Sequence, residues 1–155
     1  MSPIVRPLAP ADAEVCDAIL LGLPDYFGHA GGRAACAEAV RSQTGWVADG
    51  AGLVLGFATW QARTSATAEI TWLAVERDRR HAGIGTAILE ALLADLRSRG
   101  FRLALTMTSA GQKPPRPGPD VYEATRRFWL ARGFLPLVEL DIWDSNLALL
   151  LVRPL

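Results

Sequence analysis

The sequence predicts one domain of the mixed α/β class, and three observations support this expectation. A chain of 155 residues suits a single domain, which at this length buries about 68–70% of its unfolded surface. Half of the residues are hydrophobic and 21% are charged, as in ordinary soluble globular proteins. Strand-like and helical segments alternate along the chain without an internal repeat. We therefore expect residues 1–155 to fold around one core.

The first third of the chain combines a short strand with two helices. The β-branched, proline-bounded segment 4–8 is typical of an edge strand, and the alanine-rich segments 11–23 and 33–42 have helical spacing. The loop between these helices carries the adjacent aromatics Tyr26 and Phe27. They could contact a substrate or pack over the neighbouring helices.

A hairpin and a third strand follow. Segments 45–48 and 53–61 are strand-like, and the turn at residues 49–52, with the sequence Asp-Gly-Ala-Gly, favours positive backbone φ angles. The next strand, 66–75, is almost continuously apolar and therefore belongs in the middle of a sheet that is covered on both faces. Glu69 interrupts it, and a carboxylate in a buried strand needs a partner or a function.

The second half of the chain again alternates helices and strands. A helix at 83–99 has apolar residues at steps of three and four, and Gly100 supplies a left-handed end. The later elements are a strand at 101–108, a proline-rich loop at 114–119, a helix at 122–131 that ends at Gly133, and strands at 135–142 and 147–152 joined by residues 144–146.

The charge balance excludes several kinds of partner. Sixteen basic and sixteen acidic side chains cancel, whereas nucleic acids and anionic membranes demand a large positive field. We expect neither as a partner. Lys113 is the only lysine, and the residues around it do not fit a P-loop.

The remaining composition argues against a metal site and a membrane anchor. Cys16 and Cys36 lack CxxC spacing, and His29 and His81 lie far apart, so we expect no metal and two buried cysteines. The amino terminus lacks an apolar signal core, and no run reaches the ~18 apolar residues of a membrane span. We therefore expect a cytoplasmic protein.

The most informative segment is 77–86, where a strand ends, arginines cluster and two glycines open a helix. Amides at a helix amino terminus point outward, glycines let a phosphate approach the backbone, and arginines add charge-assisted hydrogen bonds. The alternative is a solvated charged turn in which the glycines serve only the geometry. A dinucleotide-binding fingerprint would require glycine at Ile88, so a nicotinamide cofactor is disfavoured.

Residues 80–85, with the sequence Arg-His-Ala-Gly-Ile-Gly, resemble the pyrophosphate-binding loop of the GCN5-related N-acetyltransferase (GNAT) superfamily. Residues 68–75 look like that family's fourth strand, and residues 128–134 resemble its Phe-Tyr-x-x-x-Gly-Phe signature. The likeness of element order covers nearly the whole chain and is closest to stand-alone prokaryotic members. It implies a single domain in which about four helices flank a central, twisted, mostly antiparallel sheet.

The resemblance also implies site residues and a co-substrate, acetyl-coenzyme A. Glu69 falls at the position of the general base of the histone-acetyltransferase branch, and the residues implied to bind the coenzyme are Leu73, Ala74, Val75, Arg80, His81, Ala82, Gly83, Ile84, Gly85, Thr86, Tyr122 and Trp129. A backbone N–H near Leu73 or Ala74 would hold the oxyanion. Glu69 could instead be a buried carboxylate paired with an arginine.

Two positions depart from the family pattern. Trp129 stands where a tyrosine often protonates the leaving thiolate, and an indole N–H does not release a proton at useful pH. Tyr122 stands where an asparagine often contacts coenzyme A, about 10 Å along the helix from Trp129. The thiolate would then be protonated by solvent or through Thr125, and Trp129 would shape the pocket.

The predicted activity is transfer of an acetyl group from acetyl-coenzyme A to a primary amine of a small molecule or peptide. The alternatives are a non-catalytic acyl-coenzyme A binding or sensor domain and a binder of phosphosugars or nucleotides. We expect the acceptor pocket in the loops at 23–32, with Tyr26 and Phe27 as substrate contacts, and at 112–120. The expected assembly is a monomer or a homodimer.

Overall fold

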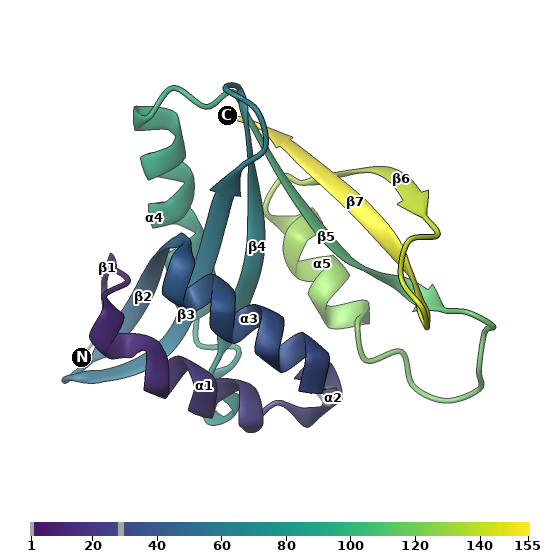
Figure 1. Cartoon of the computed structure of the whole chain (residues 1–155), viewed down its shortest axis with the longest axis horizontal. Coiled ribbons are helices and arrows are strands. Elements are labelled where there is room, and N and C mark those ends of the chain that lie inside the picture. Colours follow the sequence, from purple (N-terminus) through teal and green to yellow (C-terminus); the bar gives the residue numbers. More distant parts are fainter. Residues whose placement is uncertain (1, 28–29) are drawn as a thin grey trace.

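The computed structural model describes residues 2–27 and 30–155 and shows one seven-stranded sheet flanked by helices (Figure 1). The strands lie in the order β1-β2-β3-β4-β5-β7-β6, and the pairing of β4 with β5 is the parallel one among antiparallel neighbours. The strands are β1 (Ile4–Pro7), β2 (Thr44–Gly50), β3 (Leu53–Ala62), β4 (Thr67–Val75), β5 (Leu103–Gln112), β6 (Leu135–Leu140) and β7 (Asn146–Pro154). This confirms the mixed α/β class and the mostly antiparallel sheet.

The described residues form five α-helices, one more than the resemblance implies. They are α1 (Ala13–Leu21), α2 (Pro24–Phe27), α3 (Ala30–Ser42), α4 (Ile84–Ser98) and α5 (Glu123–Ala131), with short 3-10 turns η1 (Pro10–Asp12) and η2 (Arg77–Arg79). The additional helix, α2, lies in the segment predicted to be a loop, and α3 begins three residues earlier than predicted. Pro24 favours the first turn of a helix, which explains the start of α2. The predicted loop also contained Gly28 and His29, which lie outside the described residues.

The hairpin of β2 and β3 confirms the turn predicted from the sequence. Ala51 and Gly52 both have positive φ angles, of 55° and 87°, as a two-residue hairpin connection requires. Asp49 Oδ1 accepts a hydrogen bond of 2.8 Å from Gly52 N and fixes the turn.

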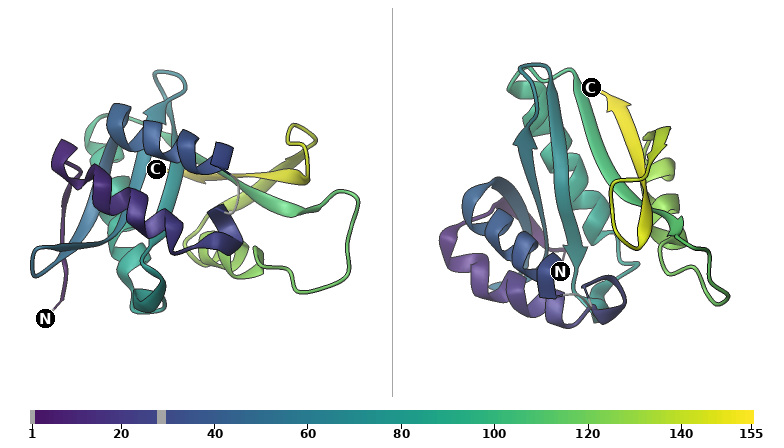
Figure 2. Two further views of the ribbon diagram at one scale, coloured as in Figure 1. Left: turned by 60° about the horizontal axis from the view of Figure 1, so that its bottom comes forward. Right: turned by 45° about the vertical axis from the view of Figure 1, so that its right-hand side comes forward.

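The sheet splits between its fourth and fifth strands. β4 and β5 pair at only three positions, the last of which joins Glu69 to Leu105. One step further, Thr106 Oγ1 still donates a hydrogen bond of 3.0 Å to the carbonyl oxygen of Ile70, and beyond that point the strands diverge (Figure 2). The molecule therefore has a wedge-shaped opening in the middle of its sheet.

The helices cover the two faces unequally. α1, α2 and α3 lie over one face of β2–β4, and α4 and α5 lie on the opposite face (Figures 1 and 2). A buried cluster forms on each face: Ile88, Leu92 and Leu96 of α4 belong to the larger one, and Cys16 and Phe57 to the one beneath α1 and α3. Both cysteines are buried, as predicted.

Two structural findings concern metal ligands and membrane-spanning helices. Among the described residues, no three histidine, cysteine or acidic side chains gather as metal ligands. None of the described helices combines the length and the apolarity needed to cross a bilayer.

Candidate functional site

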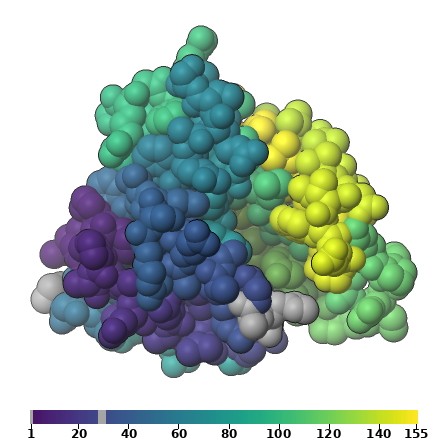
Figure 3. All heavy atoms as spheres, viewed as in Figure 1, coloured from purple at the N-terminus to yellow at the C-terminus, as the bar shows by residue number. Residues whose placement is uncertain are grey.

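The opening between β4 and β5 forms a cleft with a volume of about 1620 Å³. Both halves of the chain line it: α2, α3, β3 and β4 on one side, and β5, α5 and the β6–β7 turn on the other. In Figure 3, recessed atoms of the middle of the chain lie between the blue segments and the yellow carboxyl-terminal strands. The cleft is large enough for an elongated ligand together with a second molecule.

The phosphate-type loop predicted from the sequence lies at one end of this cleft. The backbone is left-handed at His81 (φ 64°) and at Gly83 (φ 80°), and Gly83 caps α4. A Cβ atom on Gly83 would meet nothing within 4 Å, so the space in front of the helix is open. α4 carries no acidic residue in its first turn, and its free N–H groups favour an anion there.

The second glycine of the loop has a packing role that the sequence did not predict. A Cβ on Gly85 would lie 3.3 Å from Phe128 Cε2 and 3.6 Å from Val75 Cγ2. Gly85 therefore permits the first turn of α4 to pack against α5 and β4, and it also lines the cleft.

Arg132 is a functional candidate that the sequence reasoning missed. Its Nε and Nη2 donate hydrogen bonds of 2.8 and 2.5 Å to Thr86 Oγ1, and its guanidinium lies 3.9 Å from the ring centroid of Phe128. It lines the cleft together with Arg79, Arg80 and Arg127, so positive charge gathers at the phosphate-loop end. The signal available in the sequence was its place next to Gly133 at the end of α5.

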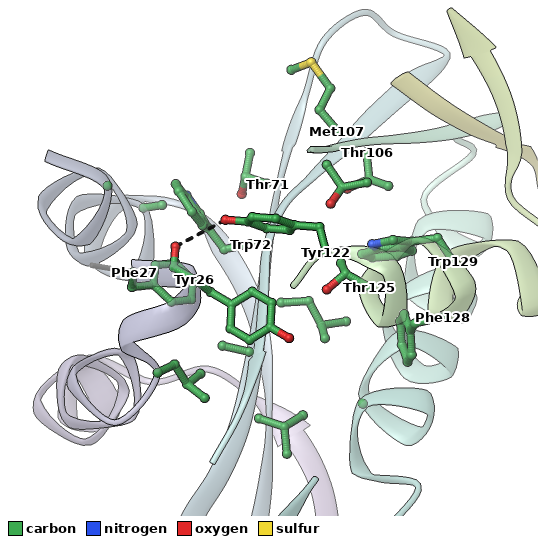
Figure 4. A pocket seen from close by; sticks show the side chains of 18 of the residues that line it. Tyr26, Phe27, Thr71, Trp72, Thr106, Met107, Tyr122, Thr125, Phe128 and Trp129 are labelled. Atoms are coloured by element: carbon green, nitrogen blue, oxygen red, sulfur yellow. Dashed lines mark hydrogen bonds between the residues drawn. The ribbon is translucent and has the colours of Figure 1, made fainter. Parts of the chain in front are cut away.

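Arg80 connects the loop to the two tyrosines of the chain. Both terminal nitrogens of Arg80 lie 3.4 Å from Tyr26 Oη, and the guanidinium lies 4.9 Å from the Tyr26 ring centroid. Tyr26 Oη donates to the carbonyl oxygen of Val121 (3.1 Å), and Tyr122 Oη donates to that of Tyr26 (3.5 Å). These bonds link α2 to the start of α5 across the cleft, and Figure 4 shows the Tyr122 side chain reaching over. Burial, and then the neighbouring Tyr26, raise the pKa of Tyr122, so its phenol remains neutral at ordinary pH.

β4 forms one wall of the cleft. Because β5 leaves after Glu69, the edge of β4 that carries Leu73 and Val75 has no strand beside it, and alternate backbone N–H and C=O groups face the opening. The register between β3 and β4 shifts at Thr71, where Thr59 pairs with Trp72 and Trp60 with Ile70. This bulge changes the direction of β4 and of its side chains next to the cleft.

Glu69 lies at the closed end of the cleft, at the last paired position of β4 and β5. It is 8% exposed, and its Oε1 lies 3.1 Å from Arg63 Nη1, although the pair is not aligned for a hydrogen bond. The alternative predicted for this residue, a buried carboxylate paired with an arginine, is therefore what the geometry shows. Glu69 also lines the cleft, so this pairing is compatible with contact to a ligand.

Trp129 lies in the opposite wall and is 5% exposed. Its ring makes edge contacts with Phe128 and Phe134, at centroid distances of 5.2 and 5.0 Å. Figure 4 shows its indole nitrogen on the side that faces Thr106 and Thr125. Packing against Phe128 and Phe134 therefore holds this ring in place.

The structure brings almost all predicted site residues together. Every one of them lines the cleft except Ala82. Tyr26 and Phe27 also line it, from α2. The loop at residues 112–120, which was predicted to help form the acceptor pocket, does not line the cleft. Residues 143–146, the turn between β6 and β7, take that place.

A split sheet with a phosphate-type loop at one end of the cleft and a buried carboxylate at the other has the shape and charge that suit an elongated anionic ligand beside a second molecule. Comparisons with known proteins identify the family. The profile of the acetyltransferase (GNAT) domain matches residues 41–135, more than half of the chain. The chain belongs to the GNAT acetyltransferase family.

Solved structures share the fold along the whole chain. A GNAT-family protein from Desulfovibrio desulfuricans is 22% identical, with a TM-score of 0.84 and coverage of 99% of both chains. The ribosomal-protein-S18-alanine N-acetyltransferase of Escherichia coli is 18% identical, with a TM-score of 0.76 over 98% of this chain and 93% of that one. The PaiA N-acetyltransferase of Thermoplasma acidophilum, in complex with coenzyme A, is 13% identical, with a TM-score of 0.76 over 100% of both chains. A comparison with curated proteins finds no match.

Proposed function

We propose that this protein transfers the acetyl group of acetyl-coenzyme A to a primary amine by direct attack. The observation that carries the proposal is the cleft itself, which places a phosphate-type loop at one end and Glu69 at the other. Family membership and the coenzyme A complex of the PaiA relative support coenzyme A as the co-substrate.

The residues present fit this co-substrate. The amides at the start of α4, with Arg80 nearby, would hold the pyrophosphate, and the unpaired edge of β4 would bind the pantetheine arm through its backbone. Open space in front of Gly83 leaves room for the phosphates.

The reaction forms a C–N bond and breaks the thioester C–S bond. Glu69, directly or through a water molecule, would accept the proton that the amine loses, and a backbone N–H near Leu73 or Ala74 would donate to the oxyanion. Solvent, with Thr125 as a relay, would protonate the thiolate, because Trp129 supplies a hydrogen bond and not a proton.

The proposal includes a cytoplasmic location and a monomeric or homodimeric enzyme, without a nucleic acid or membrane partner. The zero net charge supports the last point, because the protein has no large positive field to attract a nucleic acid or an anionic membrane.

The test is the substitution Glu69→Gln. We expect turnover at neutral pH to fall by roughly 10² or more, with coenzyme A affinity nearly unchanged, because the amide cannot accept the proton. Thiol release and calorimetry measure the two quantities. Glu90→Gln, on the exposed side of α4, is the matched control.

A second variant separates catalysis from ion pairing. Arg63→Met removes the partner of Glu69 and leaves the carboxylate in place. If both Glu69→Gln and Arg63→Met reduce only the stability and leave turnover unchanged across the pH range, Glu69 has no part in the chemistry. Binding of acetyl-coenzyme A without thiol release for any amine would favour the non-catalytic sensor domain instead.

A further inference from the structure

The cleft beyond the phosphate loop has apolar, aromatic walls. Phe27 of α2 and Trp72 of β4 lie 5.7 Å apart between ring centroids at an angle of 43°, and both are only half-buried. In Figure 4 they lie on the side opposite Thr106 and Met107 of β5. Trp143, which is 37% exposed, adds a further ring from the β6–β7 turn.

The polar side chains around these walls are mostly neutral and bonded to one another. Gln43 accepts a hydrogen bond of 2.5 Å from Thr71 and donates one of 3.4 Å to Gln61. Across the cleft, Ser109 donates one of 2.9 Å to Asn146. These groups provide no charge to a ligand, and their mutual bonds reduce their capacity for new ones.

The charges of the cleft are divided between its two ends. Among the described residues that line it, the arginines and His81 come from the phosphate loop and α5, and the acidic residues are Glu38, Glu69 and Asp144. Glu69 is the buried member of the three, whereas Glu38 and Asp144 are exposed at the rim. Glu69 already pairs with Arg63, so the buried part of the cleft suits a single amino group on an apolar body, and a second buried cation would have no partner.

We propose that the acceptor is a monoamine with a flat apolar body, of the arylalkylamine type. This inference rests on the proposed function and specifies its substrate class. The ring of the acceptor packs against Phe27 and Trp72, in the tilted and edge-on arrangements that aromatic side chains favour. Its amino group then lies toward Glu69 and attacks the thioester, so that the amide and the free thiol are the products.

Thiol release with matched amines tests the proposal. The probes are 2-phenylethylamine, spermidine, an aminoglycoside and a tripeptide with a free amino terminus. We expect kcat/KM for 2-phenylethylamine to exceed that for each of the others by at least tenfold. A polycation or the peptide as the preferred acceptor would overturn the arylalkylamine assignment and leave the acetyltransferase proposal standing.

A variant and its matched control test the site. Phe27→Ala should raise KM for 2-phenylethylamine about tenfold and leave KM for acetyl-coenzyme A unchanged. The control is Phe101→Ala, because Phe101 is also half-buried and in edge contact with a tryptophan, Trp60 at 5.4 Å, but does not line the cleft. Equal effects of the two variants on KM for the amine would contradict the assignment.

If none of the amines is acetylated, a direct measurement of amine binding tests the aromatic subsite. Calorimetric titration of 2-phenylethylamine into the protein saturated with coenzyme A should then still show saturable binding that Phe27→Ala weakens. Such binding without turnover would reject the proposed function and keep the aromatic subsite. The absence of both binding and turnover would overturn the subsite as well.

Discussion

The notable features of Gly83 are its backbone conformation and the empty space beside it. Its φ of 80° lies in the left-handed region, which favours glycine. No atom lies within 4 Å of the position that a Cβ would take, so within the protein itself a side chain here would meet no neighbour, and only a bound ligand would be displaced by it. A loop of this kind is predictable from the sequence because it depends on neighbouring residues. The packing function of Gly85 was not, because Phe128 comes from a distant helix.

We predict that Gly83→Val weakens binding of coenzyme A by more than tenfold and that binding of the parent also weakens as salt is added, because the site recognises phosphate. Calorimetry in low and high salt measures both effects. Gly100→Val is the control for backbone strain, since Gly100 has a φ of 88°, equally open space, and a position at the other end of α4. If Gly83→Val folds and binds as tightly as Gly100→Val, the loop does not hold the phosphates.

A second prediction at this scale concerns Trp129. Trp129→Tyr should preserve turnover or raise it, because a phenol with a pKa of ~10 restores a proton donor near the leaving sulfur. Trp129→Phe should lower turnover less than tenfold, equivalent to under about 1.4 kcal/mol of activation free energy, because packing against Phe128 and Phe134 is retained. A large fall in turnover for the phenylalanine variant, with coenzyme A affinity intact, would show that the indole N–H acts directly.

At the scale of elements, a charged cluster joins the first strand to the first helix. Arg6 of β1 donates hydrogen bonds of 2.9 Å to both oxygens of Asp12, and Asp12 Oδ2 accepts one of 2.8 Å from Ala9 N. Arg6 also contacts Asp49 of β2 at 3.1 Å. This cluster fixes the entry of α1 against the edge of the sheet.

We predict that Asp12→Asn lowers the free energy of unfolding at pH 7 by about 2 kcal/mol. The hydrogen bonds from Arg6 hold the pKa of Asp12 below its ordinary value of 3.8, so the unfolded chain binds the proton more tightly. The stabilisation is therefore present above pH 3.8 and disappears as the pH falls through the lower pKa of the folded state. Urea unfolding of parent and variant from pH 7 to pH 3 measures it, and a pH-independent difference would contradict this account.

Elements were predictable where their signals are local. The Asp-Gly-Ala-Gly turn gives the hairpin, and helical spacing gives α4. The single-turn helix α2 was missed because four residues are too few for a periodic pattern. The β6–β7 turn lies at the cleft because β7 pairs with β5. Local sequence patterns do not predict which distant strands pair, so the position of this turn was not predictable.

At the scale of the whole molecule, the two cysteines report on the integrity of the fold. Cys16 and Cys36 are fully buried in the cluster beneath α1 and α3, and burial raises the pKa of each thiol to about 12. Both thiols are therefore protonated and shielded at neutral pH.

We predict that the native protein gives no signal with a thiol reagent at pH 8 and that two thiols per chain react after unfolding in urea. The thiol released from coenzyme A is then measured without background in the activity assays. Fast labelling of either cysteine in the native protein would show that α1 and α3 open locally.

The short seam between β4 and β5 also has a mechanical consequence. Three paired positions and one side-chain hydrogen bond connect β4 and β5, so this short pairing has the geometry of a hinge between the two parts of the sheet. A small rotation at such a hinge would produce a larger displacement at the open end of the cleft. At that end, Tyr26 donates a hydrogen bond of 3.1 Å to the carbonyl oxygen of Val121, and Tyr122 donates one of 3.5 Å to the carbonyl oxygen of Tyr26. The two tyrosine rings are also in edge contact. The two phenol side chains therefore connect the two sides of the cleft at its mouth, in addition to the packing of Phe128 against Gly85 and the bonds from Arg132 to Thr86.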